Sequence, residues 1–415
     1  MSRILLVLAA LAASCSAPAV RSPGREPGPV AAPLPVQPSG PHTQLADEEH
    51  QRALTATPQS DRAVLLPRTD VPVTFDQGST RLEGTIALPA RWSGTQHPGV
   101  IIVHGTGPMS RDGTMPGQLG LGFGFEIAVY RELAEALAHH GYAVLRYDKR
   151  TCGPTAGCSN RYAHVPYVLA GHEFTTEQYI RDAEAALKRL ADDPAVDPQR
   201  LFYIGHSQGG ELIPELLARS AGVRAGVMLA APFSTPDELV AQQAERIRWA
   251  FERIGKGHEA TREHAILAKA ASQLRALRRG VHLGEPILGQ PPEVWRSWLS
   301  AAERAPRYAH ELGRPLLVLG GEYDYNVEPR EILQWKEWLS KSLCRQHRVR
   351  VLPCVTHALN CISEPEPTRI GAEDIGRDLS PELVHEILLF LGIHGAPKDE
   401  RGLRPTSLHP ASSSP

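Results

Sequence analysis

The chain has 415 residues, of which 42% are apolar and 22% are charged, and its formal net charge is −2. This length accommodates one large domain or two ordinary ones, and the composition is that of a globular protein with a substantial core. A net charge so close to zero gives no electrostatic basis for binding nucleic acid or an anionic membrane surface, so neither is expected as a partner.

The amino terminus predicts an export signal. Arg3 precedes an apolar run, Ile4 to Ala13, that is too short to span a bilayer. The run ends in Leu11-Ala12-Ala13-Ser14-Cys15, which resembles the processing site of a bacterial lipoprotein, although Ala12 stands where leucine is usual. We expect residues 1–15 to be a signal peptide with a candidate lipobox. The protein would be exported, as a cell-envelope lipoprotein anchored at Cys15 or, after ordinary cleavage, as a periplasmic or secreted protein.

Two segments are expected to lie outside the folded domain. Residues 16–68 are rich in proline, glycine, alanine and serine in their first half, which is typical of a semi-extended tether. A short helix over Gln44–Leu54 is the one element expected there. Residues 396–415 are polar and rich in proline and serine, and we expect them to be disordered.

Residues 69–395 have the pattern of an α/β domain. The expected strands up to residue 230 are Val71–Phe75 and Leu82–Leu88 (an opening hairpin), Gly99–His104, Tyr142–Tyr147, residues 201–207 and Ala225–Ala230. The expected helices are Glu126–His140, Thr175–Ala191 with Thr175 as its cap, and one that ends near Arg219. Because continuously apolar strands alternate with amphipathic helices, the sequence predicts a doubly wound, mostly parallel sheet.

The alternation stops between residues 233 and 311, where three helices are expected at Asp237–Ile254, His258–Arg279 and Pro292–Ala305. It resumes with strands at Arg314–Leu319 and Arg348–Leu352 and helices at Pro329–Leu339 and Pro381–Leu391. We interpret residues 233–311 as a helical lid inserted over the sheet. A separate domain is the alternative, which is less favoured because the alternation resumes directly afterwards.

The cysteines predict two local disulfides. Export permits disulfide formation. Cys152 and Cys158 lie close together in one predicted loop, and so do Cys354 and Cys361, which leaves Cys344 free. No Cys/His group has the spacing of a structural zinc site, and no G-x-G-x-x-G follows a strand, so neither a metal nor a dinucleotide cofactor is expected.

The turn between the strand at 201–207 and its helix carries Gly205-His206-Ser207-Gln208-Gly209, which fits the nucleophile-elbow pattern G-x-S-x-G. A serine at the tip of such a sharp turn has a strained backbone, and the strand and helix pass so close together that glycine is needed on either side. The motif is short, and an ordinary Gly/Ser turn is the alternative. Its position between an apolar strand and an amphipathic helix favours Ser207 as a nucleophile.

A serine nucleophile needs a base and a carboxylate that orients the base, and in this architecture they follow in the order serine, acid, histidine. The loop after Leu319 offers Glu322 and Asp324, and we choose Asp324 because it lies further into the loop. The chain has 18 histidines, so position has to select the base. His357 follows the last predicted strand, whereas His385 lies on the closing helix and is a distant second candidate.

Acyl transfer also needs two N–H donors for the oxyanion. The backbone N–H of Gln208, at the start of the helix, is one candidate. The N–H of Thr106, in the glycine-rich loop after the strand at 99–104, is the other. His104 is expected to make a structural hydrogen bond, and His206 to shape the pocket.

Four stretches beside the elbow resemble the α/β-hydrolases, in particular bacterial serine esterases related to dienelactone-hydrolase and prolyl-oligopeptidase-like hydrolases. These are His104-Gly105-Thr106-Gly107-Pro108 with Arg111-Asp112-Gly113, Leu145 to Thr151, Val196 to Arg200, and Gly321-Glu322-Tyr323-Asp324. The resemblance implies hydrolysis of carboxylic esters by a Ser-His-Asp triad through an acyl-enzyme, with no cofactor. Thr151-Cys152-Gly153-Pro154 replaces the Gly-x-Gly that similar proteins carry at that point. Dienelactone hydrolases proper use a cysteine nucleophile, and Ser207 argues against that chemistry.

The sequence therefore predicts a serine hydrolase that acts on a small-molecule ester, with Ser207, Asp324 and His357 as its triad. A peptidase or amidase on the same fold is the first alternative. The second is a non-catalytic envelope lipoprotein that keeps the fold as a binding module. The sequence does not determine the oligomeric state.

Overall fold

The computed structural model describes residues 68–89, 96–113, 128–152, 158, 174–253, 255–362 and 378–395. The predicted signal peptide, the tether with its Gln44–Leu54 helix up to residue 67, and the tail at 396–415 lie outside these ranges, as does Cys15. Within them, no helix combines the length and the apolar character needed to cross a bilayer.

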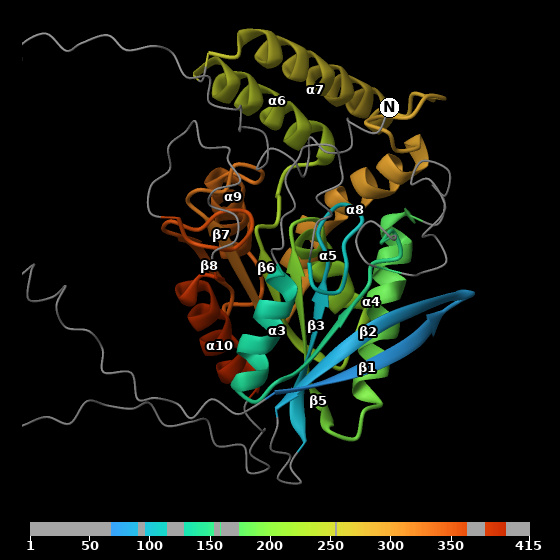
Figure 1. Cartoon of the computed structure of the whole chain (residues 1–415), viewed down its shortest axis with the longest axis vertical. Helices are drawn as coiled ribbons and strands as arrows, with labels where there is room; N and C mark the ends of the chain where they lie inside the picture. Colours follow the sequence, from blue (N-terminus) through green and yellow to red (C-terminus); the bar gives the residue numbers. More distant parts are fainter. Residues whose placement is uncertain are drawn as a thin grey trace, which may run out of the picture. The chain divides into compact units, whose positions relative to one another are not determined.

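One eight-stranded sheet forms the centre of the fold, with the strand order β1-β2-β4-β3-β5-β6-β7-β8 (Figure 1). Its strands are β1 (Arg68–Gln77), β2 (Thr80–Pro89), β3 (His97–Val103), β4 (Ala143–Tyr147), β5 (Val196–His206), β6 (Val223–Leu229), β7 (Leu316–Gly321) and β8 (Arg348–Leu352). The β1–β2 and β2–β4 pairs are antiparallel, and every pair from β4 through β3 to β8 is parallel. The predicted doubly wound, mostly parallel sheet is confirmed.

Helices cover both faces of the sheet because side chains alternate between its two sides along each strand. The helices in chain order are α3 (Val129–His139), α4 (Thr176–Ala191), α5 (Gln208–Arg219), α6 (Pro236–Arg253), α7 (Gly257–Arg278), α8 (Pro292–Glu311), α9 (Pro329–Ser340) and α10 (Pro381–Gly395). On β5, Phe202 and Ile204 pack in the cluster that includes α3 and α10. Tyr203, between them, packs on the opposite side with α4, α5 and α9.

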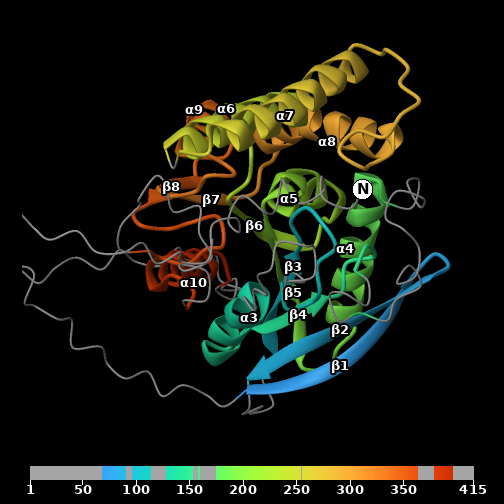
Figure 2. The same ribbon diagram turned by 45° about the horizontal axis from the view of Figure 1, so that its top comes forward.

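Three helices, α6, α7 and α8, separate β6 from β7, as the sequence predicts for residues 233–311. They have a hydrophobic cluster of their own, centred on Leu267, Leu274 and the stacked rings of Trp295 and Trp298. Figures 1 and 2 show α6 and α7 side by side, at the end of the sheet away from the β1–β2 hairpin. Helix α8 extends six residues beyond the expected end at Ala305 and passes through Pro306.

Other local predictions hold with small shifts of boundary. The Thr175 hydroxyl accepts a hydrogen bond from the Gln178 N–H and caps α4, as expected. Strand β5 begins at Val196, earlier than the predicted residue 201, and α10 continues to Gly395 instead of ending at Leu391. Both expected disulfides, Cys152–Cys158 and Cys354–Cys361, are present, and Cys344 is the one free cysteine of the described residues.

Candidate active site

Ser207 lies at the junction of β5 and α5 with φ 54° and ψ −123°. A positive φ costs free energy for any residue with a Cβ, so the surrounding structure has to hold this conformation. The Ser207 N–H donates to the Leu229 carbonyl oxygen of β6 at 2.8 Å, and the Glu211 N–H of α5 donates to the Ser207 carbonyl oxygen at 3.1 Å. The turn therefore has the geometry of a nucleophile elbow.

The glycines of the motif are required by backbone contacts on two sides. A Cβ on Gly205 would lie 2.2 Å from the Gly209 carbonyl oxygen, so the end of the strand and the start of the helix leave no room for a side chain. A Cβ on Gly209 would lie 2.4 Å from the carbonyl oxygens of Val103 and His104. The second constraint comes from β3 and its loop, which the sequence motif does not indicate.

His357 and Asp324 are joined directly. The His357 Nδ1–H donates to Asp324 Oδ2 at 2.8 Å, and the Asp324 carboxylate is fully buried whereas 21% of the His357 side chain is exposed. The other carboxylate oxygen, Oδ1, accepts hydrogen bonds from the N–H groups of Asn326 at 2.9 Å and Val327 at 2.8 Å. This fixes the carboxylate in one orientation, with Oδ2 facing the imidazole.

The alternative acid and base lie elsewhere. Glu322 is exposed and accepts a hydrogen bond from the Cys354 N–H at 3.3 Å. His385 is exposed on α10. Of the residues weighed from the sequence, the structure brings Asp324 and His357 together and leaves these two outside the pair.

His206 connects the elbow to the loop of His357. Its Nε2–H donates to the His357 carbonyl oxygen at 2.9 Å, and the two imidazole rings have their centres 4.9 Å apart. Because His206 directly precedes Ser207, this contact brings the His357 loop next to the serine. No hydrogen bond between the Ser207 hydroxyl and the His357 imidazole is present in the described part of the chain, and such bonds often form only when substrate binds.

The Tyr130 hydroxyl extends this connection to the loop after β3. It lies 3.1 Å from His206 Nδ1 and accepts a hydrogen bond from the Gly105 N–H at 2.9 Å. Since His206 Nε2 faces a carbonyl oxygen and must carry the proton, Nδ1 is the acceptor and Tyr130 donates to it. Burial, followed by the nearby His357, lowers the pKa of His206 to about 3, so the ring stays neutral and keeps this tautomer.

The two candidate oxyanion donors belong to segments that adjoin the serine. Gln208 is the first residue of α5, where N–H groups have no partner within the helix. The loop after β3 runs alongside the elbow, because a Cβ on Gly105 would be 3.2 Å from the Ser207 Cβ. Tyr130 already engages the Gly105 N–H, so the next N–H along the loop belongs to Thr106.

The segment after β4 holds the loop after β3 at several points. The Lys149 N–H donates to the Met109 carbonyl oxygen at 3.1 Å, and the Thr151 hydroxyl donates to the Gly107 carbonyl oxygen at 3.0 Å. Asp148 accepts hydrogen bonds from the backbone and side chain of Arg111. Thr151, which stands where similar proteins carry glycine, contributes one of these contacts.

His104 has the structural role expected for it. The ring is buried between Tyr130 and Tyr147, with ring centres 5.4 Å and 4.7 Å away. Burial and the nearby Lys149 lower its pKa to about 3, although a hydrogen bond with the Tyr147 backbone acts in the opposite direction. The ring is therefore held neutral and enclosed.

The disulfides flank the site. The Cys354–Cys361 bridge closes the loop that contains His357, and within it the Thr356 N–H donates to the Asn360 carbonyl oxygen at 2.9 Å. Asp148 lies close to Cys152 and Cys158 in an arrangement of potential metal ligands. Because those two cysteines form a disulfide, they have no thiolate to offer a metal ion.

The inserted helices contact both α5 and the loop of Asp324 directly. The Trp298 Nε1–H of α8 donates to Glu211 Oε2 on α5 at 2.8 Å. The Gln243 side chain of α6 donates to the Asn326 carbonyl oxygen, in the loop of Asp324, at 3.1 Å. Burial is the main reason that the pKa of Glu211 rises to about 8, and Glu331 adds to it.

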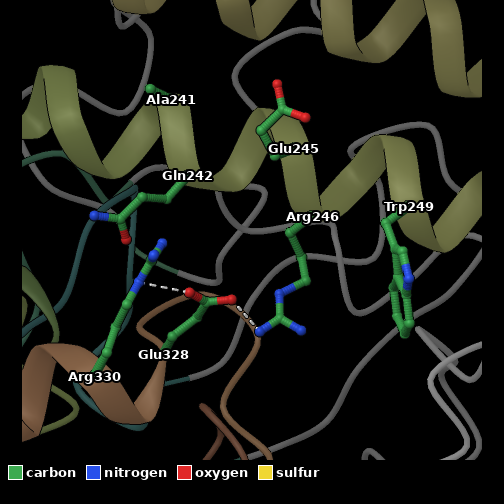
Figure 3. Close-up of a pocket in the computed structure, with 7 residues that line it drawn as sticks. All are labelled: Ala241, Gln242, Glu245, Arg246, Trp249, Glu328 and Arg330. Atoms are coloured by element: carbon green, nitrogen blue, oxygen red, sulfur yellow. Dashed lines mark hydrogen bonds and ion pairs between the residues drawn. The ribbon is translucent and has the colours of Figure 1, made fainter.

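A cavity of about 530 Å³ lies between α6 and the start of α9 (Figure 3). Glu328 forms ion pairs with both Arg246 and Arg330, and the remaining lining residues are Ala241, Gln242, Glu245 and Trp249. Ser207 and His357 do not line it. The cavity is therefore a feature of the insertion and of the loop after Asp324, separate from the candidate nucleophile.

A family model described as serine aminopeptidase, S33, matches residues 121–365, which is more than half of the chain. The chain belongs to this family. The predicted relation to the α/β-hydrolases, and with it the expectation of an enzyme of the serine-hydrolase type, is confirmed at the level of the family.

Individual relatives include both esterases and peptidases. The esterase EstD of Thermotoga maritima is 29% identical over 261 residues, which are 62% of this chain and 54% of EstD, so the chain spans about half the length of this curated relative. Among solved structures, an acylaminoacyl peptidase from Pyrococcus horikoshii aligns with 80% of this chain and 43% of its own at 16% identity and a TM-score of 0.48. An esterase from Pyrococcus furiosus aligns with 80% of this chain and with 92% of its own chain, at 16% identity and a TM-score of 0.45.

Proposed function

We propose that this protein hydrolyses carboxylic esters, with Ser207 as nucleophile, His357 as base and Asp324 as the residue that orients His357. The observation that carries the proposal is the hydrogen bond between His357 and the buried Asp324 carboxylate. The loop of His357 is held against the elbow, which presents Ser207 with a positive φ. An orienting carboxylate, an imidazole and a strained serine are what nucleophilic acyl transfer requires.

In the proposed first step, Ser207 Oγ attacks the acyl carbon while its proton passes to His357 Nε2. The Asp324 carboxylate stabilises the imidazolium that results, since it already accepts the Nδ1–H. The carbonyl oxygen becomes an oxyanion, which the N–H groups of Thr106 and Gln208 would stabilise, the second with the help of the α5 dipole. His357 then returns the proton to the departing alcohol, and the acyl group stays on Ser207.

The second step reverses the roles. Water enters where the alcohol has left, His357 Nε2 takes one of its protons, and the hydroxide attacks the acyl carbon. A second oxyanion forms in the same place. It collapses as His357 returns the proton to Ser207 Oγ, which releases the carboxylic acid and restores the enzyme.

The test is turnover of a short-chain nitrophenyl ester by wild-type protein and Ser207→Ala. We expect the variant to lose nearly all turnover, about 10⁶-fold, while its melting temperature changes little. Ser220→Ala, at the carboxyl end of the same helix, serves as the matched serine-to-alanine control. Unchanged turnover in Ser207→Ala would remove Ser207 from the mechanism. A panel of acyl esters of increasing length then defines the acyl specificity.

A peptidase or amidase is the second candidate because the matching family model is described as a serine aminopeptidase. The same acyl-enzyme chemistry cleaves amides if the leaving amine is protonated by His357. Aminoacyl-anilides and esters assayed side by side separate the two activities. Turnover of the anilides without turnover of esters would make the peptidase or amidase the favoured function. A binding protein without catalytic activity would leave Ser207 unlabelled by a fluorophosphonate probe.

We further propose that the protein is exported and lipidated at Cys15. The two disulfides support an oxidising compartment, since such bonds are rare in the cytosol. Incorporation of a labelled fatty acid into wild-type protein but not into Cys15→Ala is the expected result. Equal labelling of the two would exclude Cys15 as the acceptor.

A further inference from the structure

Lys149 is a buried cation beside the candidate oxyanion donors that the mechanism above does not use. Only 4% of the residue is exposed. Its ammonium donates to the Gly105 carbonyl oxygen at 2.7 Å and reaches Gln208 Oε1 at 3.4 Å. It also lies 4.2 Å from the centre of the Tyr179 ring. One side chain therefore contacts both segments that supply a candidate donor.

The contact with Gly105 bears directly on Thr106 because the two residues share a peptide bond. A peptide is planar and trans here, so its C=O and N–H point in opposite directions. When the ammonium holds the Gly105 carbonyl oxygen, the Thr106 N–H is turned away from Lys149. The Tyr130 hydroxyl holds the N–H of Gly105, which belongs to the preceding peptide, so both peptides that meet at the Gly105 Cα are held by side chains.

Lys149 is desolvated where it contacts Gly105 and Gln208. Burying an ammonium costs several kcal/mol unless charge partners compensate. Asp182 on α4, whose carboxylate favours the charged form of Lys149, is fully buried and accepts two hydrogen bonds from Arg150, at 2.7 Å and 2.5 Å. An apolar side chain of similar length would fill the same space without the cost of desolvation. The ammonium is instead directed at a peptide carbonyl and an amide.

We propose that Lys149 is a positioning residue that orients the Gly105–Thr106 peptide, so that the Thr106 N–H is directed at the oxyanion before substrate arrives. This inference rests on the proposed function. Lys149 also places a positive charge behind the peptide, and the charge polarises the N–H toward a developing anion. The effect appears in the transition state, where the oxyanion exists, and is small for the uncharged ester.

Burial and the Asp182 carboxylate act on the charge of Lys149 in opposite directions. Burial lowers the pKa of Lys149 to about 7, and Asp182 acts against that shift. His104, in the loop after β3, is neutral because its own pKa is about 3. Tyr179 on α4 and Gln208 on α5 present a ring face and an amide oxygen. None of these neighbours competes for the Gly105 carbonyl oxygen.

The experiment compares wild type with Lys149→Met, which keeps the length of the side chain and removes the donor and the charge. We expect kcat for a short-chain nitrophenyl ester to fall about 10- to 100-fold. This is no more than the fall in kcat that removal of one oxyanion donor causes. KM should stay within about twofold, since ground-state binding is unaffected. Lys188→Met, an exposed lysine on α4, is the matched control and should behave as wild type.

A transition-state analogue separates a positioning role from a structural one. An alkyl boronic acid forms a tetrahedral adduct with the serine, so its inhibition constant should rise in Lys149→Met by the same factor by which kcat/KM falls. Wild-type kcat in Lys149→Met, or a fall in kcat with unchanged boronic acid affinity, would overturn the inference. If Lys149→Met does not fold, Lys149→Gln is judged by the same criteria. Ser207→Ala distinguishes the two proposals, because turnover in that variant refutes the proposed function itself.

Discussion

Replacing Asp324 by asparagine tests the proposed triad more specifically than removing its nucleophile. Oδ1 of Asp324 accepts two backbone hydrogen bonds, from Asn326 and Val327, and these fix which atom faces His357. In Asp324→Asn the amide oxygen has to take that position, because an NH₂ group cannot accept from an N–H. The amide nitrogen then faces His357 Nδ1 and donates to it.

This substitution forces the wrong tautomer on the base. His357 Nδ1 becomes an acceptor, so its proton moves to Nε2, the atom that has to accept the proton of Ser207. The variant also lacks the negative charge that stabilises the imidazolium. The corresponding change in a serine protease lowers kcat about 10⁴-fold, or about 5 kcal/mol of transition-state stabilisation, and we expect a loss of 10³- to 10⁴-fold here.

The assay is kcat for a short-chain nitrophenyl ester at pH 7, together with the nitrogen chemical shifts of His357, which report the tautomer. We expect the fold to survive, because asparagine has the same shape and keeps both backbone hydrogen bonds. Glu322→Gln, which removes the charge of the exposed acid nearby, is the control and should retain activity. Activity within tenfold of wild type in Asp324→Asn, with the tautomer changed, would refute the assigned role of Asp324.

Three further outcomes follow from the contacts around the site. Tyr130→Phe leaves the Gly105 N–H and His206 Nδ1 unpaired, so urea unfolding should show a loss of about 1–3 kcal/mol, whereas an unchanged midpoint would mean that neither bond stabilises the fold. The pKa of Glu211 is raised, so wild-type stability should decline by a few kcal/mol as the pH rises from about 4.5 through about 8, and Glu211→Gln should abolish this decline. Replacing Cys354 and Cys361 by serine should cost about 2 kcal/mol and lower kcat more than it changes KM, unless the His357 loop keeps its conformation without the bridge.

The elbow could be predicted from the sequence because one of its two steric constraints is local. A serine flanked by glycines at a strand–helix junction has few other structural explanations, and the contacts of Gly205 with Gly209 lie within the motif itself. The repeated apolar strands predicted the sheet for the same reason, since each was recognisable by itself. Asp324 and His357 required one more premise, the chain order of the triad, and their hydrogen bond agrees with it.

The supporting residues could not be predicted because their partners are distant in sequence. In the sequence, Tyr130 has the position of an apolar residue of α3. Its hydroxyl nevertheless contacts both Gly105 and His206, and His206 lies 76 residues after Tyr130. Lys149 reads as an ordinary charge after a strand. Its contacts with Gly105 and Gln208 form because β4 and β5 lie on either side of β3. No local sequence pattern predicts this strand order. Likewise, nothing near Glu211 in the sequence indicates Trp298 as its partner.

These contacts have a consequence for how the site responds to mutation. The Gly105–Thr106 peptide is held on its carbonyl side by Lys149, and the N–H just before it is held by Tyr130. Tyr130 in turn fixes His206, which holds the loop of His357. The oxyanion loop, the elbow and the base are thus joined by one set of hydrogen bonds. Substitutions within such a network are not additive, so the loss of either Tyr130 or Lys149 should already remove much of what both contribute to kcat.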